Sequence, residues 1–399
     1  MSQNKYRNLW CHLLHLFITE TASMAPTTPQ IITCKGAVWW GGGENDVRVE
    51  DIQVDPPKAT EVRVKVLCAS ICHTDIVWAR GFPIPLAPRV LGHEGVGIVE
   101  SIGEKVTDLK VGDVVIPTYV GECQECENCI SRESNFCLKY PMRINGLMMD
   151  NTSRMSIRDQ KIFHLFSCST FAEYMVTETN YLVKVDPDID PANASFISCG
   201  FSTGFGAVWK EAKVESGSSV AVFGLGAVGL GAISAAKIMG ATKIIGIDKN
   251  EMKKVKGEAF GMTDFINPDA SDKPSSELVK ELSGGMGVDY SFECTGVIPL
   301  VSQALQATKL GKGKTIAIGS VTEEFVPINF RSILLGRTLK GSLFGGLKPQ
   351  SDLPFIIDKC LKKEFPLREL LTHEVPLTDI DKALELLGKP DCIKVVIRM

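Results

Sequence analysis

Four cysteines cluster in one short polar stretch of the chain, at Cys123, Cys126, Cys129 and Cys137. Closely spaced thiols on a turn-rich loop favour a closed four-thiolate zinc site, with an iron–sulfur cluster as the alternative for the same ligands. A zinc ion with four protein ligands offers no open position. We therefore assign this lobe, residues 122–138, to stability rather than to chemistry.

A second set of possible ligands is spread over three motifs: Cys72 in CHTD, His93 in GHEG and Cys199 in SCG. One such residue alone is more often a packed side chain than a ligand, so the third candidate carries the weight. Cysteine, histidine and cysteine leave a tetrahedral zinc ion with one open position, as a catalytic zinc requires. Whether the three side chains meet depends on the fold.

The stretch 220–248 has the pattern of a dinucleotide-binding unit. An apolar strand-like run is followed at once by GLGAVG at 224–229 and by a helical segment of small residues. A second apolar run at 243–247 ends in Asp248. Strand, glycine turn, helix, strand and acid in this order predict a site for a dinucleotide.

Each part of this unit has a physical task. Gly224 permits a tight turn, Gly226 lets the pyrophosphate approach the backbone, and Gly229 lets the helix pack close to its strand. The helix N-terminus offers free N–H groups to the phosphates. Asp248 can accept hydrogen bonds from the ribose hydroxyls, and its charge favours NAD over NADP.

The composition is that of an ordinary globular protein. With 399 residues, 44% of them hydrophobic and 23% charged, the chain suits about two domains. The net charge of −4 predicts no nucleic-acid partner and no membrane partner, and no apolar run approaches the ~20 residues of a membrane helix. Thirteen cysteines, several at ligand spacing, favour a reduced, metal-binding cytoplasmic protein over a disulfide framework.

The first 30 residues differ from the rest of the chain. A short apolar run at 9–18 superficially resembles a secretion signal, but two histidines interrupt it and Glu20 follows it. We expect residues 1–30 to be a disordered leader, or an upstream extension with the working start at Met24. A targeting segment is the alternative.

Two kinds of pattern divide the remainder of the chain. Residues 31–200 are rich in strand-like runs such as 34–40, 47–54 and 61–67, whereas 141–170 is polar and is expected to be a surface connection. From 201 to 343 strands and helices alternate, which predicts an α/β fold with a doubly wound parallel sheet. The expected strands of this second part lie at 264–266, 288–292, 315–318 and 339–342, and its expected helices lie at 275–282 and 300–308.

The tail carries an amphipathic segment at 380–387 and an apolar strand at 393–397, which is expected to return to the first domain. Taken together, the motifs resemble those of the zinc-dependent medium-chain alcohol dehydrogenases, and within them the plant type. The match runs from about residue 32 to the C-terminus. It rests on CHTD at 72–75, GHEGVG at 92–97, the four-cysteine lobe, SCGFSTGFGA at 198–207, FGLGAVGL at 223–230 and FGGLK at 344–348.

The resemblance implies a Rossmann nucleotide-binding domain, 201–343, and a β-rich GroES-like catalytic domain made of 31–200 and 344–399. It also implies two Zn²⁺ ions per subunit, a catalytic one on Cys72, His93 and Cys199 and a structural one on the four-cysteine lobe. Thr74 would relay the alcohol proton, Asp75 would orient the zinc histidine, and Glu94 would assist ligand exchange. The implied NAD contacts are His73 and Lys394 on the pyrophosphate, Asp248 and Lys253 on the ribose, Thr203 and Val228 on the nicotinamide, and Gly224, Gly226, Ala227 and Gly229 in the turn.

One position departs from the family pattern. Many members carry a histidine five residues after the first zinc cysteine, which passes the proton on to solvent, and this chain has Val77 there. The relay from Thr74 must then end at the cofactor ribose, continue through water, or be impaired. Trp78, Phe82 and Tyr119 are expected to line a bulky apolar substrate pocket.

The expected function is the reversible, NAD-linked oxidation of a primary or secondary alcohol to an aldehyde or ketone, by hydride transfer from a zinc-bound alkoxide. The alternative is a zinc-containing hydroxynitrile lyase, which cleaves a cyanohydrin, because zinc polarisation of a carbinol oxygen serves both reactions. A zinc- and NAD-binding protein with little catalysis is the third interpretation. The expected partners are a small-molecule alcohol or aldehyde and, as the resemblance implies, a second copy that meets residues 321–335 in a homodimer.

Overall fold

The apolar run before the glycine turn forms β12 (Ser219–Phe223), which lies in the middle of a six-stranded parallel sheet. The structure, a computed structural model, describes residues 29–43, 46–131, 133–321, 323 and 325–399. The sheet order is β14-β13-β12-β15-β16-β17. This is the doubly wound order, in which the third strand of this half in sequence, β14, lies at one edge. The other strands are β13 (Lys243–Ile247), β14 (Asp264–Ile266), β15 (Tyr290–Glu293), β16 (Lys314–Ala317) and β17 (Thr338–Gly341).

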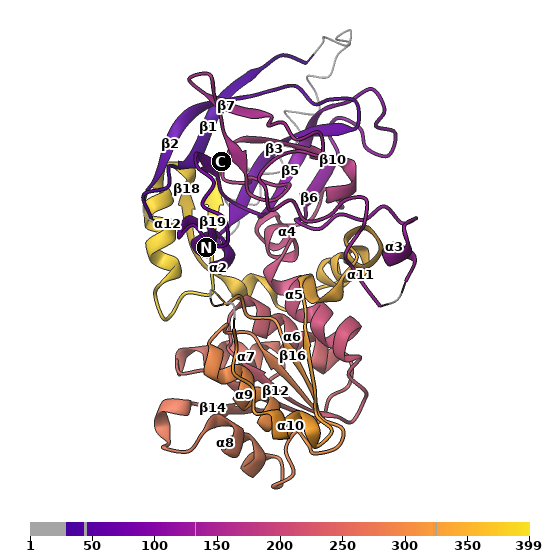
Figure 1. Cartoon of the computed structure of the whole chain (residues 1–399), viewed down its shortest axis with the longest axis vertical. Coiled ribbons are helices and arrows are strands. Elements are labelled where there is room, and N and C mark those ends of the chain that lie inside the picture. Colours follow the sequence, from indigo (N-terminus) through magenta and orange to yellow (C-terminus); the bar gives the residue numbers. More distant parts are fainter. Residues whose placement is uncertain (1–28, 44–45, 132, 322, 324) are drawn as a thin grey trace, which may run out of the picture.

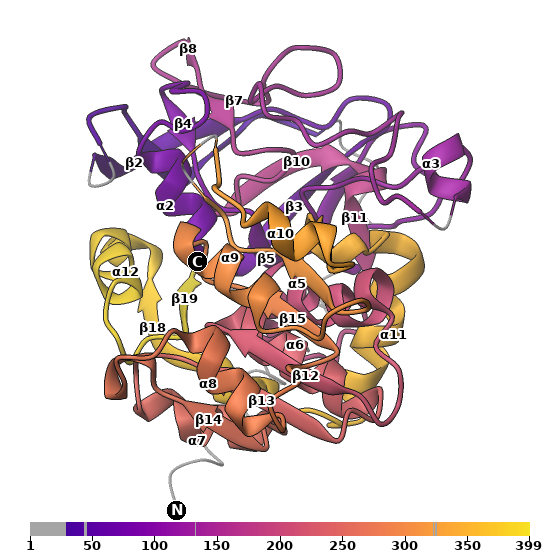
Figure 2. The ribbon, with the colours of Figure 1, turned by 60° about the horizontal axis from the view of Figure 1, so that its bottom comes forward.

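Helices connect these strands and cover the sheet. Right-handed crossovers place α6 and α7 on one face and α8 and α9 on the other, and each pair packs together. Figure 2 shows α8 and α9 side by side in front of the sheet. The predicted α/β fold is confirmed. The helices of this half are α6 (Ala227–Ile238), α7 (Met252–Phe260), α8 (Ser275–Leu282), α9 (Ile298–Gln306) and α10 (Phe330–Leu334).

The other half of the molecule is built from two β-sheets, which form the upper part of Figure 1. One has the order β8-β7-β2-β1-β4-β9, and the other has β11-β6-β5-β3-β19-β18, with β10 also paired to β3. The first contains β1 (Ile32–Trp39), β2 (Val47–Val54), β4 (Arg89–Val90), β7 (Met155–Ile157), β8 (Gln160–Lys161) and β9 (Phe163–His164). The second contains β3 (Glu61–Ser70), β5 (Glu94–Ile102), β6 (Val114–Pro117), β10 (Tyr174–Glu178), β11 (Leu182–Lys184), β18 (Leu371–Pro376) and β19 (Lys394–Arg398).

The end of the chain returns to this β-rich half. β19 pairs antiparallel with β3, so that Val396 lies opposite Ser70. The yellow C-terminal strands therefore lie beside the indigo N-terminal ones in Figure 1. The remaining helices are α2 (His73–Ala79), α3 (Glu127–Ile130), α4 (Pro191–Ile197), α5 (Gly200–Gly206), α11 (Pro349–Leu361) and α12 (Ile380–Leu387), with a π-helix, η2 (Ala207–Ala212), after α5 and a short 3-10 turn, η4 (Phe344–Gly346), before α11.

Helices α5 and α6 cross very closely, which explains the small residues in both. A methyl group on Gly204 would overlap the carbonyl oxygen of Val228, and one on Gly231 would overlap that of Phe201. The helix after the glycine turn is buried along most of its length. A helix buried on several sides cannot show a one-sided apolar pattern, and α6 accordingly carries small and apolar residues all round.

The segment 141–170 is not the surface connection that its polarity predicts. It contains β7, β8 and β9, and several of its side chains are fully buried. Arg154 is 2% exposed and forms ion pairs with Glu61 and Asp150, at 2.5 and 2.8 Å. Polar residues can enter the interior when they bring partners, so their frequency in this segment did not indicate exposure.

The predicted leader lies almost wholly outside the described residues, which begin at 29. In the part of the chain that the structure describes, the helices are too short or too polar to span a lipid bilayer.

Candidate active site and metal centres

Asp75 organises the first possible metal cluster. It lies in the first turn of α2, is fully buried, and accepts hydrogen bonds from the backbone N–H groups of Cys72 (2.9 Å) and Gly92 (3.1 Å). Its Oδ1 also lies 3.0 Å from Nδ1 of His93. One carboxylate therefore fixes the start of α2, the loop before β5, and the orientation of the His93 ring.

The ring of His93 is oriented toward two thiols. Its Nε2 is buried and has no hydrogen-bond partner within the described chain. The ligand atoms of Cys72, His93, Glu94 and Cys199 all lie within 4.8 Å of one another. An orphaned imidazole nitrogen beside two thiols is the donor set of a zinc ion with an open position, so the residues fit the metal.

Cys199 reaches this cluster because the helical path breaks at its position. It lies between α4 and α5 with φ −150° and ψ −82°, outside the helical region. Its Sγ lies 3.8 Å from Oη of Tyr119. A built Cβ on the next residue, Gly200, would lie 3.3 Å from the Cβ of Ala227, so the cluster borders the N-terminus of α6.

The charges around the cluster favour a thiolate. A hydrogen bond from Cys199, followed by the charges of Lys394 and His93, outweighs burial and holds the pKa of Cys72 well below its usual range. Burial lowers the pKa of His93, but Asp75 and Cys72 outweigh this and raise the pKa well above its usual range. A thiolate is the form in which cysteine binds a metal.

Glu94 is buried next to the cluster, where its carboxylate has polar partners. Its carboxylate pairs with Nζ of Lys394 and accepts hydrogen bonds from Ser70 and from the backbone of Gly200. Lys394 is 3% exposed and also donates to the carbonyl of Ile71, at 3.2 Å. Lys394 is thus already paired with Glu94. Its predicted contact with the cofactor would require a pyrophosphate oxygen to accept a further hydrogen bond from the same ammonium group.

The four-cysteine lobe has the spacing of a single ion. Sγ of Cys123 lies 3.8 Å from that of Cys129, and Sγ of Cys126 lies 4.0 Å from that of Cys137. All four sulfur atoms lie within 4.8 Å of one another. Four sulfurs at ~2.3 Å from one zinc ion are about 3.8 Å apart in a tetrahedron. The spacing fits zinc, and it is too tight to enclose a cluster of several iron atoms.

The lobe is fastened to the segment that leads into α11. Nζ of Lys348 donates to the carbonyl of Cys129 at 2.6 Å, and Nδ2 of Asn135 donates to the carbonyls of Leu343 and Leu347. Glu122 accepts a hydrogen bond from the backbone N–H of Ser351, at 2.9 Å. A lobe that ties distant segments together suits the structural role predicted for it.

Aromatic rings form a wall beside the histidine. The ring of Tyr119 lies edge-on to His93 at 5.5 Å and to Phe344 at 5.2 Å. Phe166 lies 5.9 Å from His93 and 5.1 Å from Trp78, again edge-on. Of the predicted pocket residues, the structure brings Trp78 and Tyr119 into this wall.

Four residues at or near the wall differ from the sequence-based expectation. Phe82 is 39% exposed and makes no ring contact with the wall among the described residues. Phe166 and Phe344 were not predicted as wall residues, because the rings that they face, those of His93 and Tyr119, are distant in sequence. Phe344 is the first residue of the FGGLK motif, which was the one available signal. Arg89 was also missed. It is fully buried, its guanidinium lies 4.7 Å over the ring of Trp78, and burial lowers its pKa to about 10.

The glycine turn has the geometry that a dinucleotide requires. Gly224 has φ +90°, which favours glycine, and a methyl group on Gly229 would overlap the carbonyl oxygen of Gly224. A Cβ on Gly226, by contrast, would meet nothing within 4 Å. This open space above the backbone fits a pyrophosphate at the N-terminus of α6.

Asp248 lies at the end of β13 and is bound to the same turn. Its carboxylate accepts hydrogen bonds from the backbone of Leu225 and of Asn250, both at 2.9 Å, and Nζ of Lys253 lies 3.5 Å from Oδ2. Thr203 is buried one helical turn after Cys199, with its Oγ1 4.0 Å from that thiol. The remaining predicted contacts lie at the surface or half-buried on the elements named above: His73 and Thr74 on α2, and Val228 on α6.

Comparison with known proteins assigns this fold and site to a family. A model of the alcohol dehydrogenase GroES-like domain matches residues 58–187, and a model described as zinc-binding dehydrogenase matches 227–362. Alcohol dehydrogenase 1 of Artemisia annua is 56% identical, covering 94% of this chain and 100% of its own length. A protein of Catharanthus roseus described as CYP enzymes assisting alcohol dehydrogenase is 57% identical, covering 93% and 100%.

Solved structures agree with this assignment. An alcohol dehydrogenase zinc-binding domain protein from Burkholderia ambifaria is 31% identical, with a TM-score of 0.85 over 93% of this chain and 100% of that chain. Benzyl alcohol dehydrogenase from Acinetobacter calcoaceticus is 29% identical, with a TM-score of 0.83 over 92% and 99%. The chain therefore belongs to the zinc-binding alcohol dehydrogenase family and is an oxidoreductase. Its relatives at 56% and 57% identity come from plants.

Proposed function

We propose that this enzyme oxidises an alcohol to an aldehyde or ketone, with transfer of a hydride to NAD and release of one proton. The observation that carries the proposal is the orphaned Nε2 of His93 beside the thiols of Cys72 and Cys199, at the N-terminus of a dinucleotide-binding helix. When bound there, zinc supplies a Lewis acid that lowers the pKa of an alcohol hydroxyl, and NAD supplies the hydride acceptor.

The residues of α2 divide the work at the alcohol oxygen. Cys72 would hold the metal. Thr74 lies two residues further along in α2, where its hydroxyl would accept the alcohol proton while it passes its own proton on. Asp75 keeps the His93 ring in place through Nδ1, so that Nε2 stays directed at the metal position. Val77 carries no group that can hold a proton, and the proton from Thr74 leaves through a ribose hydroxyl or through water.

The nucleotide-binding residues place the cofactor against the same cluster. Gly226 leaves room for the pyrophosphate, and Asp248 binds the ribose hydroxyls while its charge excludes a 2′-phosphate. Thr203 and Val228 lie near Cys199 and at the start of α6, where they support the nicotinamide ring. These residues would direct the nicotinamide ring of a bound NAD toward the cysteine–histidine cluster.

The aromatic wall indicates the class of alcohol. Tyr119 and Phe166 lie edge-on to His93, with Trp78 and Phe344 packed behind them, which suits an alcohol with an apolar, preferably aromatic, body. The neighbour from Acinetobacter calcoaceticus is a benzyl alcohol dehydrogenase. We propose that aromatic and other bulky primary or secondary alcohols are better substrates than ethanol.

The four-thiolate lobe completes the proposed metal content at two zinc ions per subunit. We further propose a homodimer paired through the nucleotide-binding half. Phe325, Phe330 and Leu334 are more than two-thirds exposed, and they precede β17, whose outer edge is free of a partner strand in the described sheet. Exposed apolar side chains beside an open strand edge suit a contact with a second copy.

The test is NADH absorbance with the zinc-loaded chain, NAD and a panel that contains benzyl alcohol, a secondary aromatic alcohol and ethanol. NADH formation above that of a Cys199→Ala control, with a higher kcat/KM for the aromatic alcohols, would support the proposal. Cyanide release from a cyanohydrin without any NADH would instead favour the lyase. No turnover in either assay would favour a binding protein with little catalysis.

A further inference from the structure

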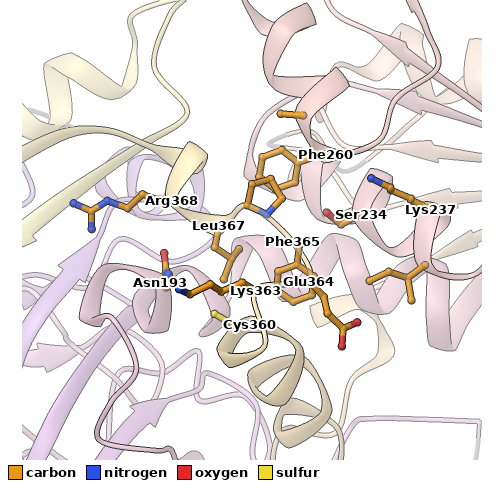
Figure 3. A pocket seen from close by; sticks show the side chains of 13 residues that line it. Asn193, Ser234, Lys237, Phe260, Cys360, Lys363, Glu364, Phe365, Leu367 and Arg368 are labelled. Carbon is orange, nitrogen blue, oxygen red and sulfur yellow. The ribbon is translucent and has the colours of Figure 1, made fainter.

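A cavity of about 410 Å³ opens where the two halves of the molecule meet, and Figure 3 shows the side chains around it. Its walls come from α4, from α6 and α7 of the nucleotide-binding half, and from the end of α11 and the segment that follows it. None of the residues that line it belongs to either metal cluster or to the glycine turn. They are Asn193, Ser234, Lys237, Ile238, Ala259, Phe260, Cys360, Lys363, Glu364, Phe365, Pro366, Leu367 and Arg368.

Two buried polar atoms of the cavity wall lack partners. Ser234 is 2% exposed, and its Oγ makes no hydrogen bond within the described chain. Oδ1 of Asn193, on the opposite side of the cavity, is also buried without a partner. Buried polar side chains are almost always satisfied, so the orphaned Ser234 hydroxyl, which can donate a hydrogen bond, indicates an occupant with an acceptor atom at this side of the cavity. The Asn193 oxygen only accepts hydrogen bonds and is therefore left to water rather than to an anion.

The charges at the mouth of the cavity are unbalanced. Glu364 forms an ion pair with Lys359 at 2.6 Å, and Arg368 forms one with Asp190 at 2.9 Å. Lys237 and Lys363 form no ion pair within the described residues. Figure 3 shows the Lys237 ammonium group on the Ser234 side and the Lys363 side chain extending toward Asn193. The local excess of positive charge favours an anionic occupant.

The rest of the wall is apolar and rigid. Phe260, Phe365 and Leu367 are buried and present rings and methyl groups to the cavity. Cys360 adds no negative charge, because burial raises the pKa of its thiol to about 12. A volume of this size, with apolar walls and a few placed polar groups, is typical of a site for a small organic molecule.

We propose that this cavity is a second ligand site, distinct from the active site, which takes a small organic carboxylate with an aromatic or branched apolar body. The carboxylate would accept hydrogen bonds from the Ser234 hydroxyl and from Lys237 or Lys363, and the apolar body would pack against Phe260 and Phe365. The inference rests on the cavity alone and stands whether or not the proposed reaction is correct.

The direct test is isothermal titration of the zinc-loaded full chain with benzoate, in the presence of saturating NADH. Benzamide is the matched control, because it has the same ring and nearly the same shape but no charge. We expect benzoate to bind at least about threefold more tightly than benzamide, the difference that one or two partly exposed charges supply. Equal affinities, or no benzoate binding up to about 10 mM, would overturn the proposal.

Variants locate the binding. Lys237→Met with Lys363→Met should reduce benzoate affinity about three- to tenfold at unchanged kcat, since neither lysine contacts the proposed reaction site. Lys254→Met, an exposed lysine on α7 outside the cavity, is the control and should change nothing. Ser234→Leu, which places a larger side chain in the cavity, should abolish binding. Benzoate binding that survives both cavity variants would show that benzoate binds elsewhere and would contradict the proposal.

Discussion

Asp75 connects three parts of the active site through its two carboxylate oxygens, namely the N-terminus of α2, the loop at Gly92 and the ring of His93. The cysteine–histidine cluster therefore depends on a residue that would not itself touch the metal. Because the carboxylate is fully buried and all its contacts are short, its effect is on orientation rather than on charge at the surface. We therefore propose that Asp75 is a positioning residue.

Asp75→Asn should preserve the fold but weaken zinc binding at the catalytic site. The amide has one acceptor oxygen instead of two and cannot hold the backbone and the His93 ring together, so we expect a loss of about 10- to 100-fold in zinc affinity. Competition with a chromophoric chelator measures this. Asp352→Asn, a buried carboxylate bound to Lys210 and to the backbone of Lys348, is the matched control. Equal zinc affinity in both variants would contradict the positioning role.

His164 should make stability depend on pH. Burial, with the charges of Arg154 and Arg89, lowers its folded pKa to about 3, against about 6.5 for a histidine in the unfolded chain. Its contribution is therefore fully present above pH 6.5 and is lost as the pH falls toward 3, because the unfolded chain takes up the proton first. Between pH 6 and 5 the wild type should lose about 1 kcal/mol per pH unit more than His164→Gln.

Urea unfolding of the wild type and of His164→Gln at several pH values gives this comparison. Glutamine can accept the hydrogen bond that the backbone N–H of Arg154 donates to Nε2. The variant thus removes the titrating group without removing the acceptor. Parallel stability curves for the two proteins across this range would contradict the buried, neutral histidine.

Single residues also mark the limit of what the sequence alone predicts. The cysteine and histidine ligands were recognisable because their types and spacing are rare outside metal sites. Arg89, Phe166 and Phe344 were not, since an arginine or a phenylalanine has no special spacing. Their significance comes from contacts with Trp78 and Tyr119 that only the folded chain creates.

Among the elements, the glycine turn and α6 act as one unit. Gly229 and Gly226 differ in what surrounds them: the first touches the turn, and the second faces open space. The element thus separates two functions, close packing and room for a phosphate, over three residues. The turn is also held from outside, because Asp248 accepts a hydrogen bond from the backbone of Leu225.

Alanine at Gly229 should lower stability, whereas alanine at Gly226 should lower the affinity for NAD. Gly229→Ala forces a methyl group onto the carbonyl of Gly224 and should cost about 3 kcal/mol or more in stability. Gly226→Ala should leave stability within about 1 kcal/mol but weaken NAD binding about tenfold or more, because the methyl group occupies the space proposed for the pyrophosphate. Thermal unfolding and NAD titration separate the two, and unchanged NAD affinity in Gly226→Ala would contradict the assignment of this space.

Several elements of the nucleotide-binding half and of the tail were predicted well from the sequence. The strands at 243–247 and 264–266 and the helices at 275–282 and 380–387 have the bounds that their patterns predict. The segment 141–170 was assigned wrongly, because its frequent polar residues predict exposure. Its polar residues are buried in ion pairs such as that of Arg154 with Glu61, which only long-range contacts reveal.

At the scale of the whole molecule, the proposed homodimer has a specific test. Phe330 and Leu334 are 71% and 72% exposed and lie on α10, next to the outer strand β17. The double variant Phe330→Glu, Leu334→Glu should convert a dimer into a monomer, because charges would be buried at the contact. Size exclusion with light scattering decides this. A monomeric wild type, or a variant that stays dimeric, would contradict the proposal.

The two clusters of metal-ligand residues occupy different positions in the molecule, and we expect their loss to have different consequences. The cysteine–histidine cluster lies between the β-rich half and the start of α6, whereas the four-cysteine lobe is tied to the segment before α11. Loss of the first should remove chemistry, and loss of the second should remove stability. The account as a whole depends on this division.

The most direct test measures zinc per chain, NADH turnover with benzyl alcohol and the melting temperature together, in the wild type, Cys199→Ala and Cys137→Ala. The account predicts about two zinc ions in the wild type and about one in each variant. Cys199→Ala should lose turnover and keep most of its thermal stability, while Cys137→Ala should lose stability first. Full turnover in Cys199→Ala, or one zinc ion in the wild type, would contradict the account.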